Sequence, residues 1–398
     1  MTERSFRFIH RFLNSRKDTP LGPGLGLPVS DSFFLFKSPD DPNEFTFFEG
    51  LSNRRTKWAG FLRDLVRTGV IDTLHTYGAF SSETDFSRDL AKRGVDTLHK
   101  NNMRIRVWVN HGPPPNVQCF GEPRSAHFFG DDPRSIFYHT DVTLRYGIEY
   151  CWTGNEPGEH LGNDSSRYLV GLRRAAGLLF RPRRVWQQLR LSSRLLRVMR
   201  LRDGQLVLGF KRYWGTAGQT PVVSDIVHQL SADRLSRLQR TGGTAVIYQH
   251  FGVRRKAPGF GVDSYVANQE PYFRPDECSA FNRIAEQYHN GNIFMTSTER
   301  LLTYNRMWSW LSWKAEDIDN RRRVVLLGLK MPGFPERLLE RTEIEGLTFY
   351  SDRPHETDIF LKTGSGTAPV GAISRNAKDH TGRESVMVPL TSLDVPEV

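Results

Sequence analysis

Four histidines follow short apolar runs, and histidine is well suited to hold a metal ion or to transfer protons near neutral pH. They are His75 in IDTLHTYG, His111 in IRVWVNHGPPPN, His139 in FYHTDVTLRYGIEYCW and His250 in TAVIYQHFG. In a parallel β/α barrel, the residues just past the carboxyl ends of the strands line one mouth although they lie far apart in the chain. The sequence therefore predicts that these histidines meet at one site.

The elements around the histidines alternate between apolar extended runs and amphipathic helices, which is typical of parallel β/α units. The first strand is expected at residues 24–30, with residues 31–36 as its exit. Further strands are expected at residues 71–75, 103–110, 147–152, 205–210, 245–249 and 292–296. Helices are expected at residues 57–68, 87–101, 140–146, 224–241 and 278–290.

Beyond residue 317 the helical pattern gives way to short extended segments with turn residues between them, at residues 323–329, 347–350, 358–362 and 385–389. The 398 residues suffice for one large domain and a small one. We therefore predict an α/β protein: an N-terminal extension at residues 1–24, an irregular (β/α)7-type barrel at residues 25–316 and a small β-rich domain at residues 317–398.

The net charge of +11 is concentrated in one segment. Between Arg167 and Arg202 there are eleven arginines and no acidic residue. Apolar residues recur there at helical spacing, so residues 165–202 are predicted to be an insertion of two basic amphipathic helices. Such helices suit an anionic membrane surface or a polyanionic substrate, although an ordinary solvated face remains an alternative. We find no nucleic-acid recognition motif and expect no nucleic acid partner.

The three cysteines form neither a metal-binding spacing nor an even set for disulfides, which favours a reducing compartment. The amino terminus lacks the continuous apolar stretch of a signal peptide, and no later run has the length of a membrane span. We expect a protein of the cytoplasm or one peripheral to the inner face of the membrane.

Several of these segments resemble the motifs of the polysaccharide deacetylase superfamily. Asp31 in VSDSFF stands where that family has its first-strand aspartate, and Asn110-His111-Gly112 resembles the start of its histidine motif. The run LRYGIEYCW, which ends at Trp152, is similar to the family's central tryptophan strand, and Tyr248-Gln249-His250 resembles its late strand. Pro115 occupies the place of the family's second histidine. The resemblance covers roughly residues 25–300 and implies an irregular barrel.

The resemblance also implies a metal-dependent hydrolase that removes acetyl groups from a carbohydrate. In such a reaction a Lewis acid polarises the acetyl carbonyl and readies a water molecule, while side chains move the protons. A divalent ion, with zinc the first expectation, would be held by Asp31, His75 and His111, with Asn116 and His139 as alternates. The expected general acid is His250, His139 is a second catalytic candidate, and Asp141 is a candidate base.

Substrate contacts are expected from side chains near the same strand ends. Sugar rings stack on aromatic faces, so Tyr77, Tyr138 and Trp152 are candidates, together with the amide of Asn116. Aromatic residues in apolar runs also commonly belong to the core, which is the competing interpretation.

Two other functions remain open at the level of sequence. A glycoside hydrolase needs two carboxylates that face each other across the site. The candidates are Asp31, Glu49, Glu149, Glu156 and Glu159. The second alternative is a non-catalytic glycan-binding or scaffold protein of a polysaccharide biosynthesis system.

Overall fold

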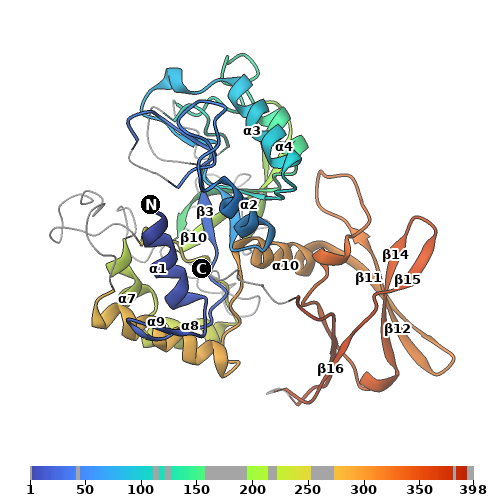
Figure 1. Cartoon of the computed structure of the whole chain (residues 1–398). Coiled ribbons are helices and arrows are strands. Elements are labelled where there is room, and N and C mark those ends of the chain that lie inside the picture. The colour runs from blue at the N-terminus through green and yellow to red at the C-terminus, as the bar shows by residue number, and fades with distance from the viewer. Residues whose placement is uncertain are drawn as a thin grey trace, which may run out of the picture. The chain divides into compact units, whose positions relative to one another are not determined.

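A mostly parallel sheet lies at the centre of the larger part of the chain in the computed structural model (Figure 1). The chain divides into a first unit, Met1–Glu299, and a second unit, Arg300–Ser392. The predicted α/β class is confirmed, because helices and several sheets are present. The structure describes residues 2–41, 45–110, 116–121, 127–156, 195–213, 222–251, 273–379 and 382–391.

The central sheet has six strands. These are β3 (Asp31–Phe33), β5 (Ile71–Leu74), β7 (Val107–Trp108), β8 (Tyr150–Glu156), β10 (Leu206–Tyr213) and β9 (Leu196–Arg200), in the order of their pairing. The first five are parallel, and β9 pairs antiparallel with β10. An isolated parallel bridge joins Tyr213 to Ile247. The carboxyl ends of the parallel strands therefore lie at one edge of the sheet.

Helices surround this sheet, and their ends follow local signals. The Ser87 side chain accepts a hydrogen bond from the Leu90 amide and caps α3, whereas α4 ends at Gly147, whose φ of 128° favours glycine. The described helices are α1 (Glu3–Leu13), α2 (Ala59–Arg67), α3 (Arg88–Lys100), α4 (Thr140–Tyr146), α7 (Ile226–Gln229), α8 (Ala232–Thr241), α9 (Pro275–His289) and α10 (Thr298–Trp310). Short strands also form at β1 (Asp18–Thr19), β2 (Gly22–Pro23), β4 (Phe36–Lys37) and β6 (Gly78–Ala79).

The first unit has two apolar clusters. One joins the sheet to α2 and α3, with Trp108 of β7 fully buried. The other joins α1 to α7, α8 and α9, which Figure 1 draws close together. The ring of Phe12 in α1 lies 6.3 Å from that of Phe281 in α9. The expected N-terminal extension thus contributes a helix to the core of the unit.

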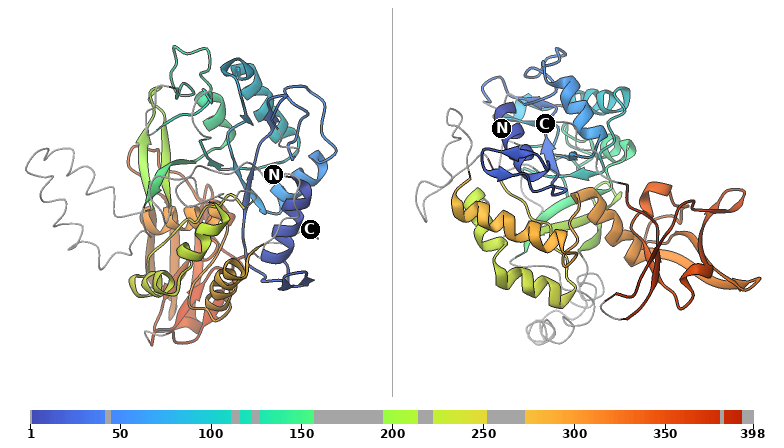
Figure 2. Two further views of the ribbon diagram at one scale, coloured as in Figure 1. Left: turned by 90° about the vertical axis from the view of Figure 1, so that its left-hand side faces the viewer. Right: turned by 60° about the horizontal axis from the view of Figure 1, so that its bottom comes forward.

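The second unit is rich in strands, which can be followed in red and orange in Figure 2. One sheet has the order β11-β12-β14-β15, and a smaller sheet has the order β13-β17-β16. The strands are β11 (Leu311–Ile318), β12 (Arg321–Leu329), β13 (Thr348–Tyr350), β14 (Thr357–Thr363), β15 (Gly366–Pro369), β16 (Ser374–Asn376) and β17 (Ser385–Met387). The unit begins at Arg300, whereas the sequence places the boundary at residue 317.

The structure corrects three expectations about elements. Strand β3 begins at Asp31 rather than ending before it, because residues 24–30 contain Gly26 in a left-handed conformation (φ 60°) and Pro28. The expected helix at residues 224–241 is divided into α7 and α8, and residues 292–296 form no strand although they are described.

The end of the predicted basic insertion is also different. Leu196 to Arg200 form strand β9, because Leu196 and Met199 are buried and the backbone pairs with β10. Two apolar residues three positions apart, such as Leu196 and Met199, are also compatible with a helix. Here the backbone hydrogen bonds with β10 determine the extended conformation. Residues 165–194 of the insertion lie outside the described part of the chain.

Candidate functional site

His75 lies directly after β5, at the carboxyl edge of the parallel sheet. Its Nδ1 atom is 3.3 Å from the hydroxyl oxygen of Ser32 in β3. Its ring stacks on that of Phe34 with centroids 4.9 Å apart, and it meets the ring of Tyr248 edge-on at 6.2 Å. His75 is thus held by neighbours from the adjacent strand and from the segment that follows α8.

Arg212 of β10 is clamped between two aromatic rings. Its guanidinium carbon lies 3.8 Å from the ring centre of Trp152 in β8 and 3.9 Å from that of Tyr248. Only 7% of Arg212 is exposed, and burial lowers its pKa to about 10, so the group remains charged at neutral pH. Two ring faces over one cation are a favourable electrostatic arrangement in a site with little water.

His250 is attached to the same arrangement through Tyr248. The Tyr248 hydroxyl oxygen is 3.1 Å from His250 Nε2, and the two rings are perpendicular with centroids 4.8 Å apart. We call His75, Trp152, Arg212, Tyr248 and His250 the mouth cluster, because each lies in or after a strand near the carboxyl edge of the sheet.

His139 lies in the core instead of the mouth cluster. Its Nε2 is 2.7 Å from the Gln118 carbonyl oxygen, and its Nδ1 is 2.7 Å from the Thr143 hydroxyl. The side chain is fully buried, and burial lowers its pKa to about 4. Tyr77 is fully buried beside it and hydrogen-bonds the same Thr143 hydroxyl at 2.7 Å, so both residues contribute to packing.

Two further predicted substrate contacts also differ from the prediction in their surroundings or burial. Asn116 is buried, with 4% of the residue exposed. Tyr138 has partners outside the mouth cluster. The Tyr138 hydroxyl donates to Asp203 at 3.2 Å, and the Arg88 guanidinium lies over its ring. Arg88 also forms two hydrogen bonds of 2.7 Å with Asp141, the candidate base, whose pKa this bonding lowers.

The expected metal ligands are only partly described. Asp31 Oδ2 lies 3.3 Å from His10 Nε2, and Asp31 Oδ1 accepts a hydrogen bond from the Ser32 amide at 2.7 Å. His111 lies outside the described residues. Among the residues that are described, no three His, Cys, Asp or Glu side chains gather as a metal site would need.

The carboxylates considered for a glycoside hydrolase do not pair across the mouth cluster in the described part of the chain. Glu49 forms an ion pair with Arg54, and Glu149 lies 3.8 Å from Arg106. The side chain of Glu156 and the whole of Glu159 are not among the residues described.

A buried charged cluster occupies the opposite edge of the sheet, before β7 and β8. Arg106 lies 3.7 Å from Glu299 and 3.8 Å from Glu149. Asp72 accepts a hydrogen bond from the Glu299 amide at 2.7 Å. Burial raises the pKa of Asp72 to about 6 and that of Glu299 to about 7, and Arg106 offsets part of the effect on Glu299.

Arg212 and Tyr248 were not predicted from the sequence. One signal was available: Leu206, Leu208 and Phe210 alternate along β10, and Arg212 takes the next place in that series. A charged residue that continues an apolar alternation is buried on the same face as the apolar ones. No comparable pattern marks Tyr248, because its ring contacts come from other strands.

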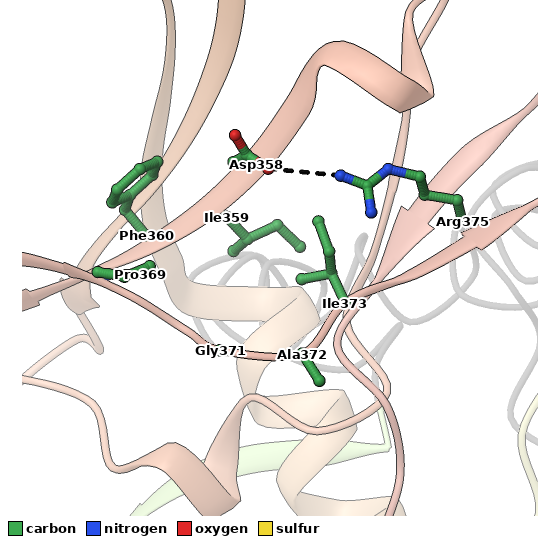
Figure 3. Close-up of a pocket in the computed structure, with 8 residues that line it drawn as sticks. All are labelled: Asp358, Ile359, Phe360, Pro369, Gly371, Ala372, Ile373 and Arg375. Carbon is green, nitrogen blue, oxygen red and sulfur yellow. Dashed lines mark hydrogen bonds and ion pairs between the residues drawn. The ribbon is translucent and has the colours of Figure 1, made fainter.

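A pocket in the second unit contains none of the predicted site residues (Figure 3). Its charged groups, Asp358 and Arg375, pair with each other at 3.5 Å. The lining residues are Asp358, Ile359, Phe360, Pro369, Gly371, Ala372, Ile373 and Arg375.

Comparison of the chain with protein-family models, with curated proteins and with solved structures found no match. Among the helices that the structure describes, none is both long enough and apolar enough to cross a membrane.

Proposed function

We propose that the chain is a hydrolase that removes acetyl groups from a carbohydrate at the mouth cluster. The observation that carries the proposal is the convergence of His75, Trp152, Arg212, Tyr248 and His250 from four separate segments of one parallel sheet. Sites in α/β proteins commonly lie at the carboxyl ends of parallel strands, which supports this location.

We also propose that the first unit is an irregular barrel of β/α units. The support is that β3, β5, β7, β8 and β10 pair in the order of the chain, and that Ile247 extends the series through its bridge to Tyr213. Sequential parallel pairing of this kind is the strand order of a β/α barrel.

The chemistry of the cluster suits an acylated sugar. The rings of Trp152 and Tyr248 supply flat apolar surface, and Arg212 supplies a fixed positive charge for a substrate oxygen that gains negative charge. His250 is the proposed proton-transfer group, since imidazole is the side chain that most often performs this role.

A divalent metal ion belongs to the proposal through Asp31, His75 and His111. The Ser32 contact at Nδ1 fits a ligand role for His75, because a metal-bound imidazole is usually oriented by a hydrogen bond at its other nitrogen. When bound, the ion would polarise the acetyl carbonyl. The cytoplasmic location, an anionic membrane contact through Arg167–Arg202 and zinc as the ion remain predictions.

One observation favours the alternative of a glycan-binding protein without hydrolysis. The Asp31 carboxylate is engaged by His10 and by the Ser32 amide, whereas a catalytic metal site would need that carboxylate as a ligand. The ring faces and the arginine of the mouth cluster would serve binding equally well.

The test is acetate release from N-acetylated chitooligosaccharides and O-acetylated xylan, with zinc or cobalt added. We expect release by the wild type, a loss of about 100-fold or more for His250→Gln, and a loss for His75→Ala. His228→Gln on the surface of α7 is the matched control and should keep full activity. Glycan binding without acetate release would overturn hydrolysis in favour of the binding protein, and absence of both would overturn the site.

Elemental analysis of the untagged protein tests the metal separately. About one ion per chain, lost in His111→Ala, is expected from the ligand set. Acetate release by protein that holds no metal, in the presence of a chelator, would remove the ion from the mechanism.

A further inference from the structure

The chain bends sharply at Thr76, directly after His75. Thr76 has a φ of 58°, a left-handed conformation that a β-branched residue rarely adopts, and its side chain is fully buried. Its hydroxyl donates to the His75 carbonyl at 2.5 Å and to the Gly78 carbonyl at 3.1 Å. Such a backbone conformation costs free energy and persists only where the surrounding structure holds it.

The bend contains one residue more than the strand segment beside it. Phe33 of β3 pairs with Leu74 of β5, and further along the same two segments Phe36 of β4 pairs with Gly78 of β6. The additional residue therefore lies between Leu74 and Gly78, in the stretch that contains Thr76. An insertion of this kind is a β-bulge, and β-bulges next to active sites change the direction of a side chain.

The side chain of Gln118, in the segment after β7, binds the backbone on both sides of residue 77. Its Oε1 accepts a hydrogen bond from the Tyr77 amide at 2.9 Å, and its Nε2 donates to the Gly78 carbonyl at 2.7 Å. Gln118 is itself fully buried, and its carbonyl oxygen lies 2.7 Å from His139 Nε2. One amide group thus satisfies a backbone donor and a backbone acceptor, which holds the bend in place.

The bend separates the surroundings of the two residues beside it. In an uninterrupted strand His75 and Tyr77 would lie on the same face, because side chains alternate with a period of two. Instead, the Tyr77 hydroxyl is in the core, 2.7 Å from that of Thr143 in α4. The His75 ring stacks on Phe34 with centroids 4.9 Å apart and also contacts Tyr248 of the mouth cluster.

We propose that Thr76 and Gln118 are positioning residues, which direct His75 into the mouth cluster. Both act through the backbone, Thr76 by its left-handed conformation and Gln118 by fixing the residues that follow. The inference rests on the proposed function for the chemical use of His75. A group that binds a metal ion or substrate must be held closely, since a small displacement of such a group greatly slows a reaction.

A pair of substitutions at Thr76 tests the backbone conformation. Thr76→Gly and Thr76→Ala both remove the hydroxyl and differ only in the Cβ atom. Glycine adopts the left-handed conformation without a steric cost, so Thr76→Gly should unfold at a higher temperature than Thr76→Ala. Thr73 of β5 is the matched control, because it is buried in the regular ladder with Val107, and there the alanine variant should be the more stable one. The same order at both positions would overturn the bend.

The direction of His75 is measurable from the ring-proton signals of the ¹³C-histidine-labelled full chain, assigned with a His75→Gln variant. Protons over an aromatic ring face have signals shifted to high field. We expect this shift for His75, because its ring is nearly parallel to that of Phe34, with an interplanar angle of 26°. Gln118→Met removes both amide hydrogen bonds, so the shift should be lost. Gln239→Met makes the same change at the exposed surface of α8 and should leave the shift unchanged.

The His10 ring, 4.1 Å from that of Phe6, reports in the same spectra whether each variant is folded. If its signals show that Gln118→Met is unfolded, Gln118→Asn serves instead, because a side chain shorter by one methylene cannot reach both backbone groups. An unchanged His75 signal in a folded variant would overturn the proposal. A residue that served stability alone would lower the unfolding temperature without moving the His75 ring.

These measurements require no substrate. The expected loss of the His75 shift together with absent acetate release by the wild type would refute the hydrolase and leave the positioning role intact. Acetate release by the wild type with an unchanged His75 signal in folded Gln118→Met would refute the positioning role alone.

Discussion

At the scale of single residues, the first unit places its buried charges in two different environments. Arg212 is surrounded by ring faces, which stabilise a cation without neutralising it. Asp72 and Glu299 lie close together at the other edge of the sheet, with Arg106 as the basic neighbour of Glu299. Arg106, with a smaller contribution from Arg104, offsets only part of the burial cost of Glu299, and this has a measurable effect on stability.

The first prediction concerns Glu299. Its folded pKa of about 7 lies above the ordinary value of 4.5, so the folded state binds the proton more tightly than the unfolded state. The resulting contribution to stability is complete below about pH 4 and is lost as the pH rises through 7. Asp72, with a pKa raised to about 6, likewise stabilises the folded state more at low pH than at high pH. In the wild type, ionisation of Glu299 should lower the unfolding free energy by about 2–3 kcal/mol between pH 5 and pH 8. Glu299→Gln should lack this part of the decrease.

Urea denaturation of both proteins at several pH values measures this difference. Glu286→Gln, an exposed carboxyl of α9, is the control and should parallel the wild type. An unfolding free energy of Glu299→Gln that changes with pH as steeply as that of the wild type would contradict the assignment.

At the scale of elements, helix α3 depends on two kinds of interaction, local capping at its ends and packing against the segment after β5. Its ends follow from local chemistry, since Ser87 caps the start and the predicted range of 87–101 agrees with Arg88–Lys100. Its packing depends on Gly94, where a Cβ atom would lie 2.7 Å from Cδ1 of the buried Tyr77. The glycine therefore permits the close approach of α3 to the segment after β5.

The second prediction compares two helical glycines. A Cβ atom at Gly60 in α2 would have open space within 4 Å, so Gly60→Ala should stabilise the protein by up to about 1 kcal/mol through helix propensity alone. Gly94→Ala gains the same propensity but forces Tyr77 to move, so it should destabilise by about 1–3 kcal/mol. Thermal and urea unfolding of the two variants measure the signs. Equal stabilisation by both would show that α3 does not pack tightly there.

At the scale of the whole molecule, the chain divides into two compact units. In the second unit, Arg306 and Glu343 form a buried ion pair, and Arg337 adds hydrogen bonds of 2.6 and 2.8 Å to the same carboxylate. Although burial opposes ionisation, the Arg337 hydrogen bonds and the charge of Arg306 lower the pKa of Glu343 to about 2. This carboxylate stabilises the unit above pH 4.5, and the effect is lost as the pH falls towards 2.

The third prediction uses this ion pair to separate the units. Glu343→Gln leaves the Arg306 charge buried without its anionic partner, which should cost about 3–5 kcal/mol. Hydrogen exchange should then show lost protection in β12 and β14, with little change in β5, β7 and β8. Glu356→Gln, an exposed change in the same unit, should leave all five strands protected. Equal loss in both units after Glu343→Gln would show one cooperative structure instead of two.

Local patterns were sufficient for much of the fold. The α/β class, the limits of α3 and α4, and the strands β12, β13, β14 and β17 follow from caps, glycines and alternation, because these features act over a few residues. Strand β9 could not be predicted in this way, since the spacing of Leu196 and Met199 also fits a helix and only the neighbouring β10 distinguishes the two.

For the site, the sequence by itself identified residues and their nearness to strand ends, whereas the tertiary structure decided which of them meet. His75 and His250 both contact Tyr248, whereas His139, after a similar apolar run, is enclosed by Gln118 and Thr143 in the core. The apolar pattern before a histidine indicates that a strand is buried. It does not predict where the histidine side chain points after the strand ends, because that direction depends on partners distant in the chain. The clamp on Arg212 was decided by the tertiary structure for the same reason, since its two rings come from β8 and from the segment after α8.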